Sequence, residues 1–284
     1  PIEFGALPLM SFGDVVKHTA HGAIGALVIG PEGSRVCRAA VTEELDADSS
    51  TYASATVCDG DGNRLYRDFV LVLQDAVDAK IKGDRAPNLA GAEEPDDYGI
   101  KAVNYRTEPL WARRGGDPSV PFEERNELDY ANVFSTKASA DGSCQADVSK
   151  LALEQSTAGA GGQPEDSACR AETPVFVTKA GSEVRLRIVH PGGHTRQQAI
   201  SLDGHDWNPY PFTDDSARIT KNYGEATDHA WIIQGNYNGI GPWMAANLLV
   251  RAGGRASLAQ DYLWRSQASF LLDGGIWGLI RVLP

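Results

Sequence analysis

The chain has 284 residues, 42% of them hydrophobic and 23% charged, with 30 Gly and 15 Pro. These values are typical of a globular protein of one or two domains and exclude collagen, coiled coil and global disorder. Acidic residues outnumber basic ones by 38 to 26, which gives a formal net charge of −12. Such a chain would repel a phosphate backbone, so we expect no nucleic-acid partner.

The sequence shows no membrane-spanning pattern. A bilayer span needs roughly 20 apolar residues in a row, whereas the longest apolar stretch, residues 22–30, has the length of a strand. We therefore expect no transmembrane segment. Residue 1 is Pro, and no basic segment with an apolar signal core follows it. The sequence is expected to be a processed product or one piece of a longer polypeptide.

Short strands are predicted mainly in the C-terminal third of the chain, with others upstream. Residues 65–74 (LYRDFVLVLQ) form one after a long polar stretch. Residues 184–189 (VRLRIV) alternate apolar and basic side chains, the period-two pattern of a half-buried strand. The other candidates are residues 22–30, 174–181, 198–202, 230–233, 246–250 and 262–270. Many short strands separated by Gly, Asn and Asp predict an all-β fold, either a sandwich or a barrel.

The composition changes in the middle of the chain. A short helix is predicted within residues 76–94, before a polar stretch broken by Pro. Residues 136–170 are rich in Ala, Gly, Ser, Gln and Asp, a composition that cannot bury enough apolar surface to form a core. We predict a loop-rich surface insertion over about residues 76–172.

The four cysteines, Cys37, Cys58, Cys144 and Cys169, form no CxxC pair and have no His at zinc-finger spacing. An even number in polar sequence favours disulfides in an oxidising compartment, so we expect a secreted, periplasmic or cell-surface protein. Three connectivities are possible. We predict the pairs that lie nearest in sequence, Cys37 with Cys58 and Cys144 with Cys169.

One short internal repeat bears on the domain organisation. Residues 22–31 (GAIGALVIGP) match residues 275–284 (GIWGLIRVLP) in register. Both segments are a Gly-x-x-Gly turn that leads into an apolar strand and ends at Pro. If each segment closes a module of one kind, the chain contains the end of one module and then a complete second one.

Two longer segments carry a family resemblance. Residues 184–207 (VRLRIVHPGGHTRQQAISLDGHDW) and 261–282 (DYLWRSQASFLLDGGIWGLIRV) resemble the multicopper oxidases, which are built from repeated cupredoxin β-sandwiches. Residues 17–29, 69–74 and 104–109 support the resemblance, which covers about half of the chain. Within the family, the sequence is most similar in style to the large multidomain bacterial members that include manganese oxidases.

The resemblance implies a domain organisation. Residues 60–284 are expected to form a cupredoxin-like Greek-key β-sandwich that carries the insertion. Residues 36–59 are predicted as a linker, and residues 1–35 as the C-terminal strands of a preceding cupredoxin module. Because part of a sandwich leaves its sheet edges and inner face open, other cupredoxin modules or chains are the expected partners of residues 1–35.

The family binds copper through imidazole and thiolate ligands in two motifs, HPxHxHGH and HCHx3Hx4M, and these are ligands that redox copper requires. Aligned on this sequence, the first motif has Gln198, Ser201 and Asp203 at its ligand positions. Aligned on Gly275, the ligand positions of the second motif hold Arg265, Ser266, Gln267, Leu271 and Ile276, with Ser266 in place of Cys and Ile276 in place of the axial Met. We therefore expect no catalytic residue and no copper cofactor of the family type in this chain, and copper only in partner modules.

Four histidines remain weak metal candidates. Aligned on Gly22, the N-terminal segment keeps His18 at an imidazole position, with His21 nearby. His205 stands at the last His of the first motif, which is not a usual ligand, and His194 follows a Pro-Gly-Gly turn. Surface or hydrogen-bonded histidines are the alternative in each case. Asp59 and the Gly-rich residues after it could belong to a calcium loop, but Arg64 occupies the position that needs Gly, so a hairpin turn is predicted.

The resemblance implies that the chain is a copper-free structural C-terminal segment of a larger secreted multicopper oxidase assembly. That assembly would oxidise a metal ion or a small reductant with dioxygen. The alternative is a non-enzymatic cupredoxin-scaffold subunit of an extracellular or surface assembly. A third interpretation is a non-blue metal site of the chain's own at His18, His21 or His205.

Overall fold

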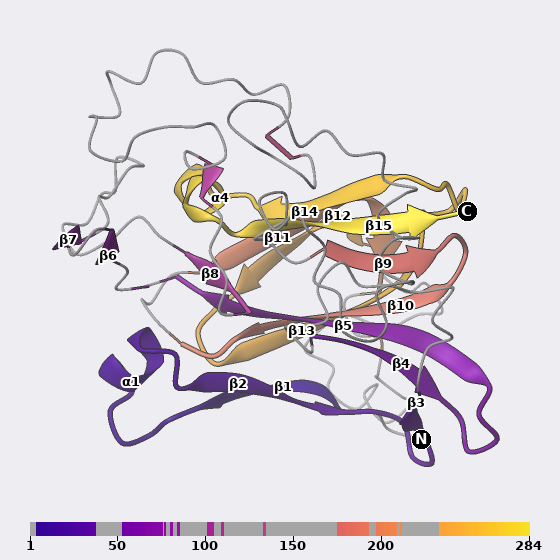
Figure 1. Ribbon diagram of the computed structural model, residues 1–284, viewed down its shortest axis with the longest axis horizontal. Helices are drawn as coiled ribbons and strands as arrows, with labels where there is room; N and C mark the ends of the chain where they lie inside the picture. The colour runs from indigo at the N-terminus through magenta and orange to yellow at the C-terminus, as the bar shows by residue number, and fades with distance from the viewer. Residues whose placement is uncertain are drawn as a thin grey trace, which may run out of the picture.

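The computed structural model describes residues 4–37, 53–75, 77, 80–81, 84–85, 101–104, 109–110, 133–134, 175–192, 197–208, 211 and 233–284. Within these residues the fold is all-β. Two sheets face each other as a sandwich, and a separate hairpin lies on the outer face of one of them (Figure 1). The predicted all-β sandwich is confirmed.

The first sheet takes its strands from distant parts of the chain. In the described residues its spatial order is β13 (Met244–Arg251), β10 (Glu183–His190), β5 (Arg64–Gln74), β4 (Ser54–Cys58) and β3 (Arg35–Cys37), with β8 (Ala102–Val103) paired to the end of β5. β10 runs parallel to β5, and the other pairs are antiparallel. β4 and most of β3 lie within residues 36–59, which are predicted as a linker, so this stretch contributes strands to the sandwich.

The second sheet consists of strands that all follow residue 174. Its order is β12 (Ile233–Ile240), β11 (Gln198–Trp207), β14 (Asp261–Ser266), β15 (Trp277–Leu283) and β9 (Val175–Lys179). β15 runs parallel to β9, and the other pairs are antiparallel. Each sheet is thus mixed, with one parallel pair.

The predicted strand over residues 262–270 is wrong in its second half. The strand β14 ends at Ser266, and Ser269–Gly274 forms the short helix α4. The chain has to reverse here because β15 returns antiparallel to β14. Gly275 completes the reversal with φ 122°, a backbone conformation that favours glycine.

Two further sequence predictions lie mostly outside the described residues. Within residues 76–94, where a short helix is predicted, the described residues include β6 (Lys80–Ile81) and β7 (Asp84–Arg85), which form a two-stranded antiparallel pair. Of the strand predicted at residues 230–233, only Ile233 is described, and it begins β12, which runs to Ile240. Its polar sequence (IQGNYNGI) hides the strand from a search for apolar alternation.

The core lies between the two sheets. On β10 the side chains of Val184, Leu186 and Ile188 alternate inward, as the period-two pattern predicts. Phe69 of β5 and Phe176 of β9 stack with ring centroids 4.5 Å apart and so join the two sheets. The second sheet contributes Ile200, Leu202, Trp264, Ile280 and Val282.

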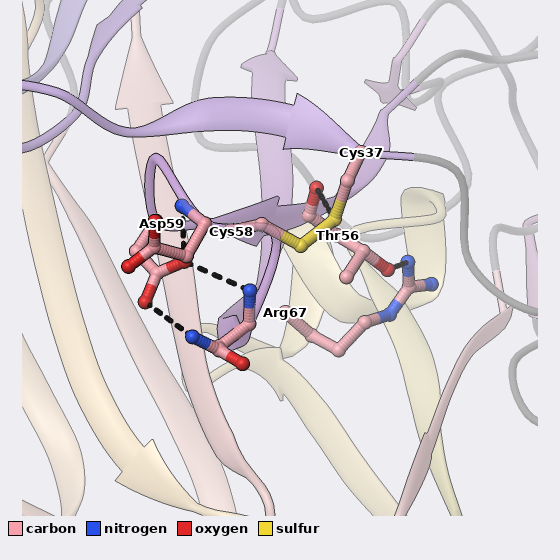
Figure 2. Close-up of a disulfide and its surroundings, with 7 residues drawn as sticks. Cys37, Thr56, Cys58, Asp59 and Arg67 are labelled. Carbon is pink, nitrogen blue, oxygen red and sulfur yellow. Dashed lines mark hydrogen bonds between the residues drawn. A yellow bond between two sulfur atoms is a disulfide. The ribbon is translucent and has the colours of Figure 1, made fainter.

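The disulfide predicted between Cys37 and Cys58 is confirmed, and it joins β3 to β4 (Figure 2). Beside it, Nη1 of the buried Arg67 donates to Oγ1 of Thr56 over 3.0 Å. Cys144 and Cys169 lie outside the described residues, so their pairing stays a prediction.

The predicted turn after Cys58 is also confirmed. It joins β4 to β5, and Asp59 Oδ1 accepts the backbone N–H groups of Asp61 and Asn63 over 3.0 and 2.8 Å. Asp59 Oδ2 accepts from the Asn63 side-chain amide over 3.0 Å (Figure 2). The Asn63 hydrogen bonds are the main reason why the pKa of Asp59 lies below its ordinary value of 3.8.

The N-terminal segment forms a separate hairpin. β1 (Gly5–Met10) and β2 (Ile24–Ile29) are antiparallel, with the short helix α1 (Lys17–Ala20) between them, and in the described residues they pair only with each other. The hairpin lies against β10 and β13 on the face of the first sheet that points away from the core (Figure 1). In the described part of the chain, every helix is too short or too polar to cross a bilayer.

Candidate functional site

The structure brings four of the expected copper-ligand positions to one end of the second sheet. Gln198 begins β11, Ser266 ends β14, Leu271 lies in α4, and Ile276 immediately precedes β15. All four side chains are fully buried. We call Gln198, Ser266, Leu271 and Ile276 the four core positions.

Backbone hydrogen bonds hold the four core positions in one neighbourhood. The N–H of Ser266 donates to the C=O of Ile276, and the N–H of Ile276 donates to the C=O of Leu271, both over 3.0 Å. The residues next to Ser266 and Gln198 are joined in the same way, because the N–H of Gln267 donates to the C=O of Ala199 over 2.7 Å. The hydrogen bond between Ser266 and Ile276 therefore joins the two ends of the segment between β14 and β15.

The chemistry of the four core positions does not fit a redox copper ion. Leu271 and Ile276 belong to the hydrophobic core and offer no ligand atom. Gln198 offers an amide and Ser266 a hydroxyl, and these hard, neutral oxygen donors cannot replace the imidazole and thiolate that a blue-copper site needs. The residues present would hold no copper of this type.

The other expected ligand positions do not join this group as donors. Ser201 of β11 pairs with Arg265 of β14. This pair is next to the pair of Ile200 and Ser266, so it lies on the opposite face of the sheet. Asp203 and Gln267 are exposed. Arg265 Nη1 donates to the C=O of Ser266 over 3.3 Å, so its side chain is directed to the backbone.

Two of the four core positions carry buried polar atoms that have no hydrogen-bond partner among the residues that the structure describes. These atoms are Oε1 and Nε2 of Gln198 and Oγ of Ser266. An unsatisfied buried polar group costs about 1–3 kcal/mol of stability. The sequence keeps polar side chains at positions where packing alone favours apolar ones.

His205 is a buried imidazole on β11. Its Nδ1 lies 2.7 Å from the C=O of Asp203 and must donate, since a carbonyl oxygen can only accept. Burial lowers the pKa of the His205 imidazole below its ordinary value of 6.5, although the Asp203 hydrogen bond and the charges of Asp206 and Asp203 act in the opposite direction. Its ring lies edge-on to Tyr262, with centroids 4.6 Å apart. His205 is therefore neutral near pH 7, and within the described part of the chain its Nε2 has no hydrogen-bond partner.

The other metal candidates stay apart from His205. His18 and His21 lie at α1, where Nδ1 of the exposed His18 is 2.7 Å from Oγ of Ser11. His194 lies outside the described residues. Within the part of the chain that the structure describes, no three His, Cys, Asp or Glu side chains are placed to hold one metal ion together.

The sequence analysis missed a buried polar group that joins the hairpin to the sandwich. Arg187 of β10 is fully buried, and its Nε and Nη2 donate to the two carboxylate oxygens of Asp68 over 2.9 and 3.3 Å. Its Nη1 donates to Oδ1 of Asn247 over 2.9 Å, and the same oxygen accepts the N–H of Ala6 over 3.0 Å. The available signal was Arg187 itself, one of two arginines that alternate with the apolar residues of β10.

A second buried polar group lies where β5 and β10 end. Nε2 of His190 lies 3.8 Å from Oδ2 of Asp75, and both side chains are buried. The buried Lys101 donates through Nζ to the C=O of Asp75 over 2.8 Å. These residues end β5 and β10 and precede β8, so the group ties three strands together.

Comparisons with known proteins bear on the fold. No family model and no curated protein matches the chain. Among solved structures it is similar to a multicopper oxidase, at 9% identity and a TM-score of 0.44 over 99% of this chain and 57% of that one. It is also similar to the copper nitrite reductase of Nitrosomonas europaea, at 12% identity and a TM-score of 0.43 over 98% and 62%.

A laccase from B. aclada is similar at 12% identity and a TM-score of 0.43, over 98% of this chain and 35% of the laccase. The chain thus spans less than two thirds of the length of each of these three proteins. Because these identities and TM-scores are low, the fold class is assigned from the order and direction of the strands in this chain.

Proposed function

We propose that this chain is a structural β-sandwich module, without a redox copper of its own, in a larger assembly of sandwich modules. The observation that carries the proposal is the filling of the four core positions. Two of them are hydrophobic core residues and two are neutral oxygen donors, all fully buried. A module packed in this way supplies shape and contacts, while any copper chemistry takes place elsewhere.

The assembly that we propose is a secreted oxidase, which oxidises a metal ion or small reductant and reduces dioxygen in its other modules. The resemblance of residues 184–207 and 261–282 to the multicopper oxidases is the reason for this choice. The disulfide between Cys37 and Cys58 supports an oxidising compartment. Mn(II) is a candidate reductant because the large multidomain bacterial members, which the sequence resembles in style, include manganese oxidases.

The test is to purify the chain from its natural source together with everything that stays bound, and to identify the chains by mass spectrometry. Copper per chain is measured before and after separation, and dioxygen consumption is followed with Mn(II), Fe(II) and a phenol. We expect copper and dioxygen consumption in the intact assembly, and a copper-free chain after separation. Copper that remains with the separated chain would overturn the proposal.

The non-enzymatic scaffold differs in one measurable respect. An intact assembly that contains no copper and consumes no dioxygen with any of the three reductants would favour the scaffold over the oxidase. The hairpin favours an assembly in both cases, since four large apolar side chains of β1 and β2 are exposed: Leu7, Leu9, Leu27 and Ile29.

A further inference from the structure

The N-terminal hairpin repeats the last part of the sandwich in structure as well as in sequence. β1, α1 and β2 follow one another as β14, α4 and β15 do: strand, short helix, antiparallel strand. With Gly22 aligned on Gly275, β2 matches β15 residue for residue, and the strand pairing then gives the equivalent residues of β1. Leu9 lies opposite Gly25 as Trp264 lies opposite Gly278, and one step further Leu7 is equivalent to Tyr262.

The equivalent residues differ in burial. Ile280 and Trp264 are 1% and 0% exposed in the core between the two sheets, whereas their counterparts Leu27 and Leu9 are 47% and 48% exposed. The same holds for the other two counterparts, the exposed Ile29 and Leu7 against the buried Val282 and Tyr262. The open face of the hairpin is thus equivalent to the core face of β14 and β15.

The opposite face of the hairpin is already covered by this chain. Ala6 is buried, with its N–H on Asn247 of β13, and the Met10 side chain approaches Gly192 just after β10. β1 (GALPLM) and β2 (IGALVI) contain no charged residue, although the chain as a whole carries a net charge of −12. Strands that are apolar on both faces are typical of strands buried on both faces.

We propose that Leu7, Leu9, Leu27 and Ile29 form the core face of a second β-sandwich, whose remaining strands a partner chain or module supplies. This inference rests on the proposed function as an assembly module, and it names the partner by its chemistry: an apolar β-sheet face of a half-sandwich. A two-stranded hairpin is marginally stable by itself, and more strands and a covered face stabilise it.

The repeat also predicts how the partner strands run. β11 pairs antiparallel with β14 only at residues 264–266, which correspond to residues 9–11, so a partner strand runs antiparallel to β1 there. Pro8, which lacks the N–H that a sheet ladder needs, lies just outside this stretch. β9 pairs parallel with β15 at residues 279–283, so a second partner strand runs parallel to β2 over residues 26–30.

The first experiment is site-specific crosslinking of the full chain produced in its natural source. Leu27 is replaced by the photoreactive p-benzoylphenylalanine, and the crosslinked peptides are identified by mass spectrometry. The same replacement of Leu258, which is exposed on the sandwich between β13 and β14, is the control. We expect Leu27, but not Leu258, to crosslink to a segment of alternating apolar residues in another sandwich chain or module.

Three outcomes would overturn the proposal: crosslinks of Leu27 to a second copy of this chain, to another segment of the same chain, or to no peptide. The double variant Leu7→Lys/Leu27→Lys gives a second measurement, because both side chains are exposed and the chain should fold with an unchanged Tm. We expect it to retain at least tenfold less of the partner, while Leu65→Lys, on the exposed part of β5, retains all of it. If both variants retain the same amount of partner, the open face of the hairpin does not bind the partner.

The copper content of the separated chain is measured in parallel. Copper in the chain would contradict the proposed function but would not change the crosslinking result. A missing crosslink in a copper-free chain would contradict only the proposed role of Leu7, Leu9, Leu27 and Ile29.

Discussion

Among individual residues, Gln198 and Ser266 are the clearest departure from what packing alone would select. Both are fully buried next to the hydrophobic residues Leu271 and Ile276, and neither side chain has a hydrogen-bond partner in the described residues. Replacing such a group with an apolar one of similar size removes a desolvation cost and loses no bond. The two polar side chains therefore lower the stability of the sandwich.

The variant Ser266→Ala should raise the free energy of unfolding by about 1 kcal/mol, because it removes a buried hydroxyl without a partner and leaves almost no cavity. Urea unfolding of the full chain measures the change. Ser269→Ala, on the exposed first residue of α4, is the control and should change the value by less than about 0.5 kcal/mol. A loss of stability in Ser266→Ala would show that the hydroxyl has a favourable contact.

The neutral His205 should make the stability of the fold depend on pH. Burial holds its folded-state pKa below the ordinary value of 6.5, so below that pH the unfolded state binds a proton that the folded state does not. The contribution of His205 is therefore fully present above pH 6.5 and is lost as the pH falls towards the lower, folded-state pKa.

We expect the Tm to fall between about pH 7.5 and about pH 5.5, and to fall less in His205→Asn, which keeps a side-chain donor for the Asp203 carbonyl. Thermal unfolding at a series of pH values measures both. Ser269→Ala, at an exposed position without a titratable side chain, should follow the unchanged chain. If His205→Asn shows the same pH dependence as the unchanged chain, the imidazole is not the titrating group.

At the level of strands and helices, a buried polar group fixes the hairpin to the sandwich. Asn247 of β13 accepts from both Ala6 and Arg187, and Arg187 in turn is paired through two hydrogen bonds with Asp68 of β5. Breaking a buried ion pair leaves an uncompensated charge, whereas removing Asn247 leaves the pair with Asp68 intact. Asn247 is therefore the residue at which the hairpin can be loosened selectively.

In Asn247→Ala we expect amide hydrogen exchange in β1 and β2 to accelerate by about tenfold, since one hydrogen bond to the strand backbone and one to a guanidinium are lost. Mass spectrometry of the exchanged peptides locates the change. The matched control Asn63→Ala removes one side-chain hydrogen bond, to Asp59 at the turn between β4 and β5, and should leave β1 and β2 protected. Unchanged exchange of the hairpin in Asn247→Ala would contradict this anchoring role.

Whether a strand could be predicted from the sequence depends on how its residues are buried and paired in the fold. β5 and β10 could be predicted because their apolar residues are continuous or alternate with period two. β12 could not, since its polar sequence is stabilised as a strand by pairing with β11. The helix α4 was hidden because Phe270 and Leu271 extend the apolar pattern of β14, and only the need to return as β15 turns the chain there.

In the whole molecule, polar and covalent links fasten the peripheral parts of the fold to the rest of the sandwich. The hairpin is fastened through Asn247, and the edge strands β3 and β4 through the disulfide of Cys37 and Cys58. β3 is a three-residue edge strand, and its Val36 side chain is exposed. The disulfide thus holds a strand that has little packing of its own.

The double variant Cys37→Ser/Cys58→Ser should lower the free energy of unfolding by about 3 kcal/mol, because the bond closes a loop with a sequence separation of 21 residues and its loss gives the unfolded chain more freedom. Guanidinium unfolding under non-reducing conditions measures it. The control is Ser54→Ala, on β4 but away from the sulfur atoms. A double variant as stable as the unchanged chain would show that packing alone holds the edge.

The candidate site could be predicted from the sequence in its identities but not in its arrangement. Motif alignment named Gln198, Ser266, Leu271 and Ile276, and the structure places them together at one end of the second sheet. It also named Asp203, which the strand exposes to solvent. Alignment reports position along the chain, while burial depends on which sheet face each residue occupies. The hydrogen bonds of Arg187 escaped for the same reason, since its partners lie 119 and 60 residues away.

The central claim, that this sandwich holds no redox copper, is tested most directly by metal loading of the purified full chain. The chain is incubated with Cu(I) or Cu(II), freed of weakly bound metal and measured for bound copper and visible absorption. We predict far less than one copper per chain and no intense blue thiolate-to-copper band, because the four core positions lack thiolate and imidazole. One tightly bound copper per chain with such a band would contradict the account.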